Sequence, residues 1–322
     1  MATPTKTIRP RTETLGTSFV ERLKGGDEIA YLITLVCSVA IILVVVLLVG
    51  ELWYNSQPAI KKFGFSFLGG RTWDPNGGVF GALPFLYGTV VTSTVALLLS
   101  IPLGVGASIF LAEMAPPRVS NGLTFLIELL AAVPSVIYGL LGIFILVPIL
   151  RKYVAPPLAM THLPIFSGPF YGFSFLAAGL VLTIMVVPFI VSVSREVLLA
   201  VPVEQREASL ALGATKWETT WQVVLPNAST GILGSIFLAL ARALGETMAV
   251  TMVVGNTPTV STSLFSPGYS IAAAIANQFA EASGQLFISA LIFLGLVLFG
   301  LTIVINAIAR ILIILTAQRA AA

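Results

Sequence analysis

Long apolar runs separated by short polar segments make up most of this sequence. Six of them reach the roughly 20 mostly apolar residues that a helix needs to cross a bilayer. They are Ile29–Leu52, Leu83–Leu111, Leu123–Leu150, Gly172–Val193, Gly231–Val254 and Phe287–Leu315. The runs are continuous and do not alternate with period two, so they predict an all-α, polytopic membrane protein and not a β-barrel. Pro102, Pro134 and Pro188 lie inside three of the runs and predict tilts or kinks there.

The polar segments between the runs divide the chain into tails, loops and a membrane core. The predicted parts are a cytoplasmic tail (1–28), a first membrane helix (29–52), an external loop (53–82), a core of five membrane helices (83–315) that includes an inner loop (194–227), and a second cytoplasmic tail (316–322). A short interfacial helix is expected at Ile271–Phe279. The aromatic residues of the first external loop predict either an interfacial belt or a docking surface; they are Phe63, Phe65, Phe67 and Trp73.

The positions of the basic residues predict the orientation in the membrane. With both chain ends in the cytoplasm, the inner segments hold Lys6, Arg9, Arg11, Arg22, Lys24, Arg118, Arg195, Arg206, Lys216, Arg310 and Arg319. The outer segments then hold only Lys61, Lys62, Arg71, Arg151 and Lys152. Because cytoplasmic loops carry an excess of Lys and Arg, this arrangement is favoured over its mirror image. We therefore expect a multi-pass protein of the plasma (inner) membrane.

Composition supports the membrane class and excludes several kinds of site. Apolar residues make up 57% of the chain and charged residues 10%, whereas soluble domains carry about 25% charged residues. The net charge is +3, but no basic patch with interleaved aromatics suggests a nucleic-acid partner. The single cysteine, Cys37, and the single histidine, His162, allow neither an intrachain disulfide nor a thiolate or histidine metal cluster. No catalytic residue, metal or cofactor is expected on this chain.

The inner loop carries a motif with defined spacing, E-A-S-x3-G-x9-V-x-L-P. Its positions are Glu207, Ala208, Ser209, Gly213, Val223, Leu225 and Pro226. The pattern resembles the EAA loop of importer-type ABC transporter permeases, with consensus E-A-A-x3-G-x9-I-x-L-P; only Ser209 and Val223 depart from it. In that family the loop docks on an ATP-hydrolysing subunit. The resemblance implies that Glu207, Ala208, Ser209, Gly213, Leu225 and Pro226 couple this chain to an ATPase, and we call residues 194–227 the coupling loop.

The local sequence of the coupling loop suits such a role. A helix is expected over Val203–Leu212 with Arg206 and Glu207 on its wet faces, and Gly213 permits the turn that ends it. A second helix, Lys216–Val224, is expected to stop at the proline that closes the motif. Two short helices joined at a glycine form a compact unit that fits a groove on another protein. The alternative is an ordinary amphipathic loop on the inner membrane face.

The sequence contains no phosphate-binding loop of the form G-x-x-x-x-G-K-[ST]. ATP hydrolysis, with its ATP-Mg, is therefore expected on a separate polypeptide.

Arg242 and Glu246 are charged residues inside the fifth apolar run. A charge at the membrane centre costs about 2.5–3.5 kcal/mol on insertion scales, so such residues face a protein interior or a wet path. A spacing of four residues places both on one face of a continuous helix. They form either a structural ion pair that neutralises itself, or a site in which the planar guanidinium of Arg242 meets an oxyanion and Glu246 orients it.

Three further segments resemble one family of permeases. Arg242–Met252 is similar to the fifth-helix signature of the C-type permease of phosphate-specific ABC importers, the PstC family. Ala132–Gly139 and Phe80–Thr89 resemble other stretches of this family. The resemblance runs from the first external loop to about Asn256 and leaves out the polar N-terminal tail. It implies a substrate pathway that includes Arg242, Glu246, Thr247 and Ser135.

The resemblance also implies the partners and a mechanism of alternating access. The expected partners are an A-type (PstA-like) permease as a heterodimer, two copies of a cytoplasmic ATPase (PstB-like), an external phosphate-binding protein (PstS-like) and membrane lipid. Two other interpretations remain at this point. One is an importer of another oxyanion such as sulfate or molybdate, and the other is a carrier or channel that works without an ATPase.

Overall fold

The structure of this chain is a computed structural model that describes residues 27–321, and its side-chain surroundings over 30–314. Residues 1–26 of the predicted N-terminal tail, with its five basic residues, lie outside the described residues, as does the side chain of Arg319. Residues 27 and 28, also predicted as tail, begin helix α2 (Asp27–Phe63). The chain divides into two compact units, residues 1–51 and 52–322. The described part of the first unit is the beginning of helix α2, and all further elements belong to the second unit.

Most described residues after α2 are helical. The long helices are α4 (Leu83–Ile109), α5 (Pro117–Ala131), α9 (Phe175–Leu199), α12 (Leu225–Leu244) and α15 (Gln285–Ala321). The short helices are α3 (Ser66–Gly69), α6 (Ser135–Leu141), α7 (Val147–Ile149), α8 (Ala155–Ala159), α10 (Val203–Ala211), α11 (Lys216–Thr219), α13 (Met248–Val253) and α14 (Ile271–Gln278). Turns of π-helix form η1 (Phe110–Met114), η2 (Gly142–Leu146), η3 (Leu150–Val154) and η5 (Thr220–Val224), and η4 (Pro164–Phe166) is a 3-10 turn. Strands β1 (Trp73–Asp74) and β2 (Val79–Phe80) pair antiparallel.

Six helical stretches of the described chain are long and apolar enough to cross a membrane. They are Ala30–Phe63, Leu83–Met114, Ser135–Ala159, Phe175–Leu199, Lys216–Leu244 and Gln285–Ile314. The predicted all-α class with six membrane helices is therefore confirmed. The bounds differ because helices continue beyond the apolar runs: α2 extends through Phe63 into the predicted external loop, and α15 extends through residues 316–321.

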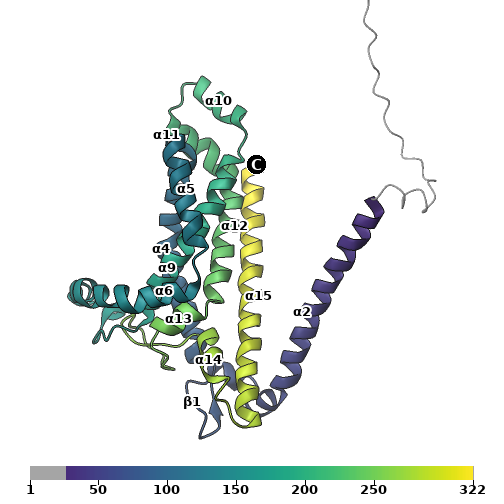
Figure 1. Ribbon diagram of the computed structural model, residues 1–322, viewed down its shortest axis with the longest axis vertical. Helices are drawn as coiled ribbons and strands as arrows, with labels where there is room; N and C mark the ends of the chain where they lie inside the picture. The colour runs from purple at the N-terminus through teal and green to yellow at the C-terminus, as the bar shows by residue number, and fades with distance from the viewer. Residues whose placement is uncertain (1–26, 322) are drawn as a thin grey trace, which may run out of the picture. The chain divides into compact units, whose positions relative to one another are not determined.

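Helix α9 lies at the centre of the second unit and contacts α4, α5 and α12, while α15 runs beside α12 (Figure 1). Among the described elements, α4 and α9 share the most extensive contact, which depends on small residues. A Cβ atom on Gly104 would come within 2.7 Å of Ile190, and one on Gly179 within 2.5 Å of Val95. Since lipid tails are as apolar as leucine, such close backbone approach is what holds membrane helices together.

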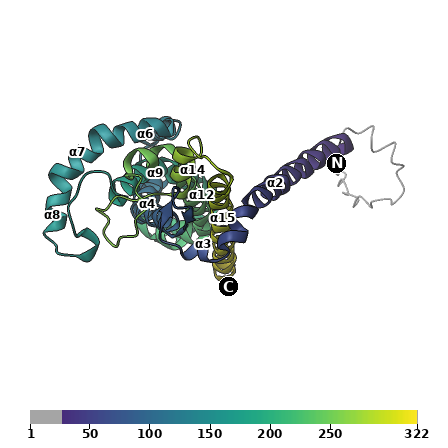
Figure 2. The same ribbon diagram turned by 90° about the horizontal axis from the view of Figure 1, so that it is seen from below.

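The third predicted helix, Leu123–Leu150, is wrong as a single element. Helix α5 ends at Ala131, and a new helical stretch begins at Ser135 and continues to Ala159. This stretch, α6 to α8, runs across the direction of the long helices and forms an arc at the side of the bundle (Figures 1 and 2). Pro134 causes the break because its ring excludes the preceding residue from helical geometry and it has no N–H to donate.

Tyr138 replaces the donor that is missing at this break. A non-proline residue at position 134 would donate its N–H to the carbonyl four residues earlier, which is that of Leu130. The hydroxyl of Tyr138 donates to that same carbonyl oxygen at 2.6 Å, and the tyrosine is buried. The N–H of Val133 donates to the same oxygen at 3.2 Å, so Tyr138 supplies its second hydrogen bond where water is scarce.

Tyr138→Phe is expected to lower the free energy of unfolding by about 1 kcal/mol, because it leaves the Leu130 carbonyl without its side-chain donor. Titration of the protein in mild detergent with a denaturing detergent measures this change. Tyr153→Phe is the matched control, since Tyr153 is 63% exposed on the arc. Equal stability of the two variants would contradict this role of Tyr138.

The aromatic residues of the first external loop form a packed core and not a belt. The ring of Trp73 makes edge-to-face contacts with Phe80 and Phe85, and its Nε1 donates to Gln278 Oε1 at 2.8 Å. Phe67 is fully buried, and only Phe65 is widely exposed. The loop is therefore fixed to α4, α14 and α15 by its own side chains. Helix α14 confirms the expected helix near Ile271, although its first turns are buried.

The coupling loop and the β1–β2 hairpin lie at opposite ends of the bundle. Helices α10 and α11 stand at one end, while β1 and α14 lie at the other (Figure 1). The long helices between them thus connect two loop regions that face opposite sides of a membrane.

Candidate functional site

A second helix break lies in the predicted fifth membrane helix. The expected helix Gly231–Val254 is wrong as a single element, because α12 ends at Leu244 and α13 begins at Met248. Gly245 follows the last helical residue, and glycine is among the weakest helix formers. The N–H of Glu246 turns to the carbonyl of Ala243 at 3.4 Å and so tightens the end of α12.

Arg242 and Glu246 consequently do not share one face of a continuous helix. Arg242 is in the last turn of α12, whereas Glu246 lies in the break. Its Oε1 accepts the N–H of Ala249 at 3.1 Å and so caps the start of α13. No ion pair joins Arg242 to Glu246 or to any other residue in the part of the chain with described side chains. The self-neutralising pair is therefore not the arrangement in this structure.

The guanidinium of Arg242 lies over the ring of Phe189 on α9, with its Cζ atom 5.9 Å from the ring centroid. Such a cation–π contact contributes about 0.5–1 kcal/mol at an exposed site and leaves the donors of the guanidinium available. Arg242 is exposed on the surface of this single chain. A cation that is exposed at membrane depth would be unfavourable against lipid, so its surface faces a wet path or another protein.

The two helix breaks come together in the structure. Helix α6 begins at Ser135 and packs directly on α13, which begins one residue after Thr247. The approach is close, since a Cβ atom on Gly139 would lie 2.5 Å from Met252 Sδ. Ser135 and Thr247 are both half-buried. The hydroxyl of Thr247 donates to the carbonyl of Gly245, two residues earlier, at 3.4 Å. Broken helices that meet in this way are typical of membrane transport sites.

Glu246→Gln is expected to retain transport within about twofold of wild type, because the amide oxygen still accepts the N–H of Ala249. Glu246→Ala removes that acceptor at a cost of about 1 kcal/mol, so uptake should fall about fivefold. Uptake by membrane vesicles measures both variants. A loss in Glu246→Gln as large as that in Arg242→Leu would show that the charge of the carboxylate acts directly.

The coupling loop consists of α10, a glycine turn, and a second helix that does not stop. Gly213 has φ of +90°, which ends α10, and the N–H of Gly213 donates to the carbonyl of Leu210 at 3.0 Å. The helix that begins at Lys216 continues through η5 into α12. The expected stop at Pro226 is therefore wrong. Wider π-turns accommodate a proline whose ring cannot take part in the regular hydrogen-bond ladder.

One motif residue contacts the neighbouring helix, and most of the others are exposed to solvent. Glu207, Ala208, Gly213 and Pro226 are exposed, and Leu225 is half-buried. The hydroxyl of Ser209, one of the two residues that depart from the family pattern, lies 3.0 Å from that of Thr219 and so joins α10 to α11. The expectation that Arg206 lies on a wet face is wrong: it is largely buried and pairs with Glu113 at 2.9 Å.

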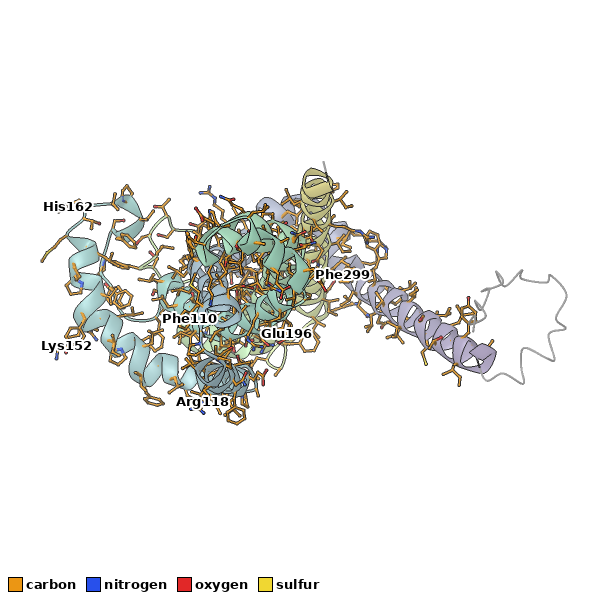
Figure 3. All side chains as sticks on the ribbon, turned by 90° about the horizontal axis from the view of Figure 1, so that it is seen from above. Phe110, Arg118, Lys152, His162, Glu196 and Phe299 are labelled. Carbon is orange, nitrogen blue, oxygen red and sulfur yellow. The ribbon has the colours of Figure 1, made fainter. Side chains whose placement is uncertain are left out.

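Sequence reasoning missed four contact residues. Phe189 and Thr219 contact the predicted site residues Arg242 and Ser209, while Glu113 and Tyr138 bind Arg206 and the Leu130 carbonyl. Tyr138 carried a signal, since it stands four residues after a proline that interrupts an apolar run. The other three lie 93, 53 and 10 residues from their partners along the chain, and no local pattern indicates such pairings. The lone histidine, His162, lies on the arc with Lys152, away from the bundle that holds Phe110 and Glu196 (Figure 3).

Comparisons with known proteins agree with this architecture. Residues 104–314 match the family described as binding-protein-dependent transport system inner membrane component. A phosphate transport system permease protein PstC from Mesorhizobium japonicum is 47% identical over 84% of this chain and 86% of its own length. One from Xylella fastidiosa is 42% identical over 96% of this chain and 97% of its own length. A solved inward-facing structure of the MetNI methionine ABC transporter has a TM-score of 0.54 and 17% identity, and covers 72% of this chain and 94% of that chain.

The MetNI likeness shows the fold alone, which is that of a type I ABC importer permease. The sequence relatives show more, because their identity is high and extends over most of both chains. This chain belongs to the family of binding-protein-dependent inner membrane transport components, and within it to the PstC permeases. It is a multi-pass membrane protein and a transport subunit of an ABC transporter complex.

Proposed function

We propose that this chain is the membrane-spanning permease subunit of an ATP-driven importer that moves inorganic phosphate across the plasma (inner) membrane. The observation that carries the proposal is identity of 42–47% over most of the chain to proteins named as phosphate transport permeases. Importers of sulfate or molybdate are not favoured, since these relatives are named for phosphate. A carrier that works without an ATPase would leave the exposed motif of the coupling loop without a role.

Arg242 is the proposed phosphate contact. Its planar fork of N–H donors matches the oxygens of phosphate, and no carboxylate among the described side chains occupies it. The bonds should be weak overall, because tight binding would slow release. Ser135 and Thr247 stand at the two helix breaks beside it and supply hydroxyl groups to the same path. Glu246 fixes the break that presents Arg242.

The exposure of Arg242 supports the need for a second permease subunit. In one chain the guanidinium lies at the protein surface, and a second polypeptide would close the path and shield this charge from lipid. We propose a PstA-like partner in this position. An external PstS-like phosphate-binding protein would deliver the substrate at the end that carries β1 and α14. Both chain termini would lie in the cytoplasm, as the distribution of basic residues favours.

Two PstB-like ATPases would supply the energy at the other end of the bundle. ATP-Mg would bind to these partners and not to this chain. Their closure on ATP would displace the exposed residues of the coupling loop, Glu207, Ala208 and Gly213, and the connected helices would open outward to receive phosphate. Hydrolysis would then return the helices to the inward-open state. The membrane path would thus be open to only one side at a time.

Transport by the reconstituted complex tests this proposal. Vesicles with this chain, its permease partner, the ATPase and the binding protein should take up labelled phosphate only when ATP is supplied to the ATPase side. A hundredfold excess of sulfate or molybdate should leave this uptake unchanged. ATP-driven uptake of sulfate in place of phosphate would overturn the substrate, and phosphate uptake without ATP or ATPase would overturn the importer class.

A further inference from the structure

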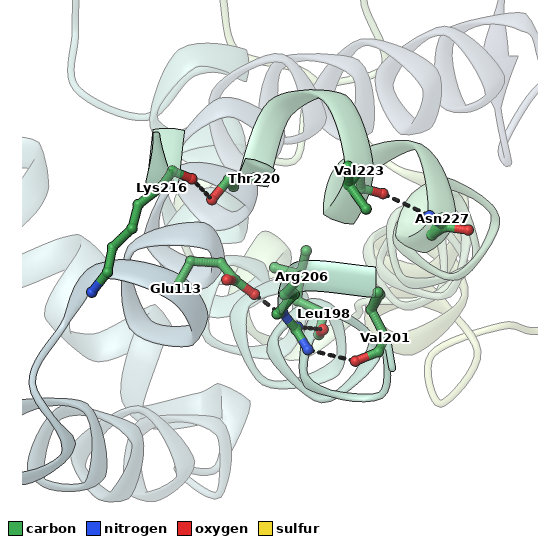
Figure 4. A network of polar contacts seen from close by, with 8 residues as sticks. All are labelled: Glu113, Leu198, Val201, Arg206, Lys216, Thr220, Val223 and Asn227. Carbon is green, nitrogen blue, oxygen red and sulfur yellow. Dashed lines mark hydrogen bonds and ion pairs between the residues drawn. The ribbon is translucent and has the colours of Figure 1, made fainter. Parts of the chain in front are cut away.

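Arg206 joins three separate segments at the coupling-loop end of the bundle (Figure 4). Its Nη2 donates to Glu113 Oε1 at 2.9 Å and to the carbonyl of Leu198 at 2.6 Å. Its Nη1 donates to the carbonyl of Val201 at 2.5 Å. Glu113 belongs to η1 at the end of α4, Leu198 to the last turn of α9, and Val201 to the turn between α9 and α10. The fixed fork of a guanidinium is suited to hold several acceptors at once.

Burial distinguishes the Arg206–Glu113 bridge from the other ion pair in this region. The side chains of Arg206 and Glu113 are only 17% and 13% exposed. Arg195 pairs with its chain neighbour Glu196, which is 70% exposed. An exposed pair contributes little, whereas loss of one partner from a buried pair leaves an uncompensated charge. Of these two pairs, only the Arg206–Glu113 bridge connects residues far apart in the sequence.

The bridge lies where movement of α10 would reach the membrane helices. Helix α10 is bonded through Arg206 to α4 and α9, the two helices with the most extensive mutual contact. It is bonded through Ser209 to Thr219, and the helix that contains Thr219 continues into α12. Glu113 itself lies in a π-turn, a local widening of the helix that often occurs at functional sites.

We propose that the Arg206–Glu113 bridge is a positioning contact that passes displacement of α10 to α4 and α9. Arg206 touches no substrate and acts through the helices that it joins. With the bridge intact, a push on the exposed face of α10 moves α4 and α9 together with it. Without the bridge, α10 moves while these helices stay in place, and ATP is hydrolysed without transport. The proposal rests on the proposed function, in which a partner ATPase acts on the coupling loop.

The ratio of phosphate transported to ATP hydrolysed tests the bridge in the reconstituted complex. Glu113→Gln removes the charge but keeps an oxygen acceptor of the same size, and Arg206→Met removes all three donated bonds. Both should lower the ratio at least about fivefold, which is the lower end of the usual coupling between distant sites. The ATPase should still co-purify with the Glu113→Gln complex, and the melting temperature of this complex should fall because the buried Arg206 charge loses its counter-ion. Glu196→Gln, in the exposed pair, is the matched control and should keep the wild-type ratio.

The double variant Glu113→Gln with Arg206→Met should have the same ratio as Arg206→Met alone, because both changes remove the same contact. A wild-type ratio in an assembled Glu113→Gln complex would overturn the proposal, and so would a double variant whose loss equals the product of the two single losses. If Arg206→Met does not assemble, the Glu113→Gln ratio alone decides. Absence of ATP-driven phosphate uptake in the wild type would instead contradict the proposed function.

Discussion

Arg242→Leu is expected to reduce phosphate uptake at least about thirtyfold while the transport complex still assembles. The guanidinium is free of any carboxylate among the described side chains and stands beside two helix breaks. In the assembled complex the proposed permease partner shields the guanidinium. Removing a charged partner from such a desolvated contact costs about 2–5 kcal/mol, and every 1.4 kcal/mol is a factor of about ten. Uptake of labelled phosphate by vesicles that hold the variant complex measures the loss.

Arg242→Leu should not destabilise the fold. A leucine in place of a mid-membrane arginine removes an insertion cost of about 2.5–3.5 kcal/mol, which exceeds the contact with Phe189 that is lost. The melting temperature of the complex should therefore stay equal or rise. Arg151→Leu is the matched control, since Arg151 is an exposed arginine on the arc. Uptake near wild type in Arg242→Leu would make Arg242 structural, and an equal loss in Arg151→Leu would point to a general effect of basic residues.

The apolar runs predicted the class and number of membrane helices because a helix that crosses lipid needs apolar residues along most of its length. They predicted the breaks poorly. Pro134 indicated a kink, but the change of direction after it depends on Tyr138 and on the packing of α6 against α13, which are tertiary contacts. Gly245 gave little warning, because a single glycine in an apolar run is also common in unbroken membrane helices.

In the coupling loop, too, the sequence predicted one feature and missed another. The motif placed Gly213 at a turn, and the structure confirms this with a positive φ. Arg206 was expected on a wet face because helical periodicity treats every charged residue as solvent-facing. Its partner Glu113 lies 93 residues earlier at the end of another helix. Periodicity contains no information on such a pairing, so the contact that carries our further inference was visible only in three dimensions.

Replacing Gly213 should separate ATP hydrolysis from transport in proportion to the backbone strain introduced. Its φ of +90° is strained for residues with a side chain, at a cost of about 1–3 kcal/mol. A Cβ atom on Gly213 would meet nothing within 4 Å, so any loss comes from the backbone and not from a clash. Gly213→Pro is the most severe change, since it fixes φ near −65° and removes the N–H that donates to Leu210.

The expected order of phosphate transported per ATP is Asn above Ala above Pro at position 213, because asparagine tolerates positive φ better than alanine does. Gly213→Asn should stay within about threefold of wild type, and Gly213→Pro should fall at least about tenfold or lose the ATPase on purification, since 1–2 kcal/mol corresponds to a factor of about 5–30. The membrane helices lie outside the turn, so the melting temperature of the purified chain should change little. A reversed order, or full coupling in Gly213→Pro, would show that the exposed turn does not transmit force from the ATPase.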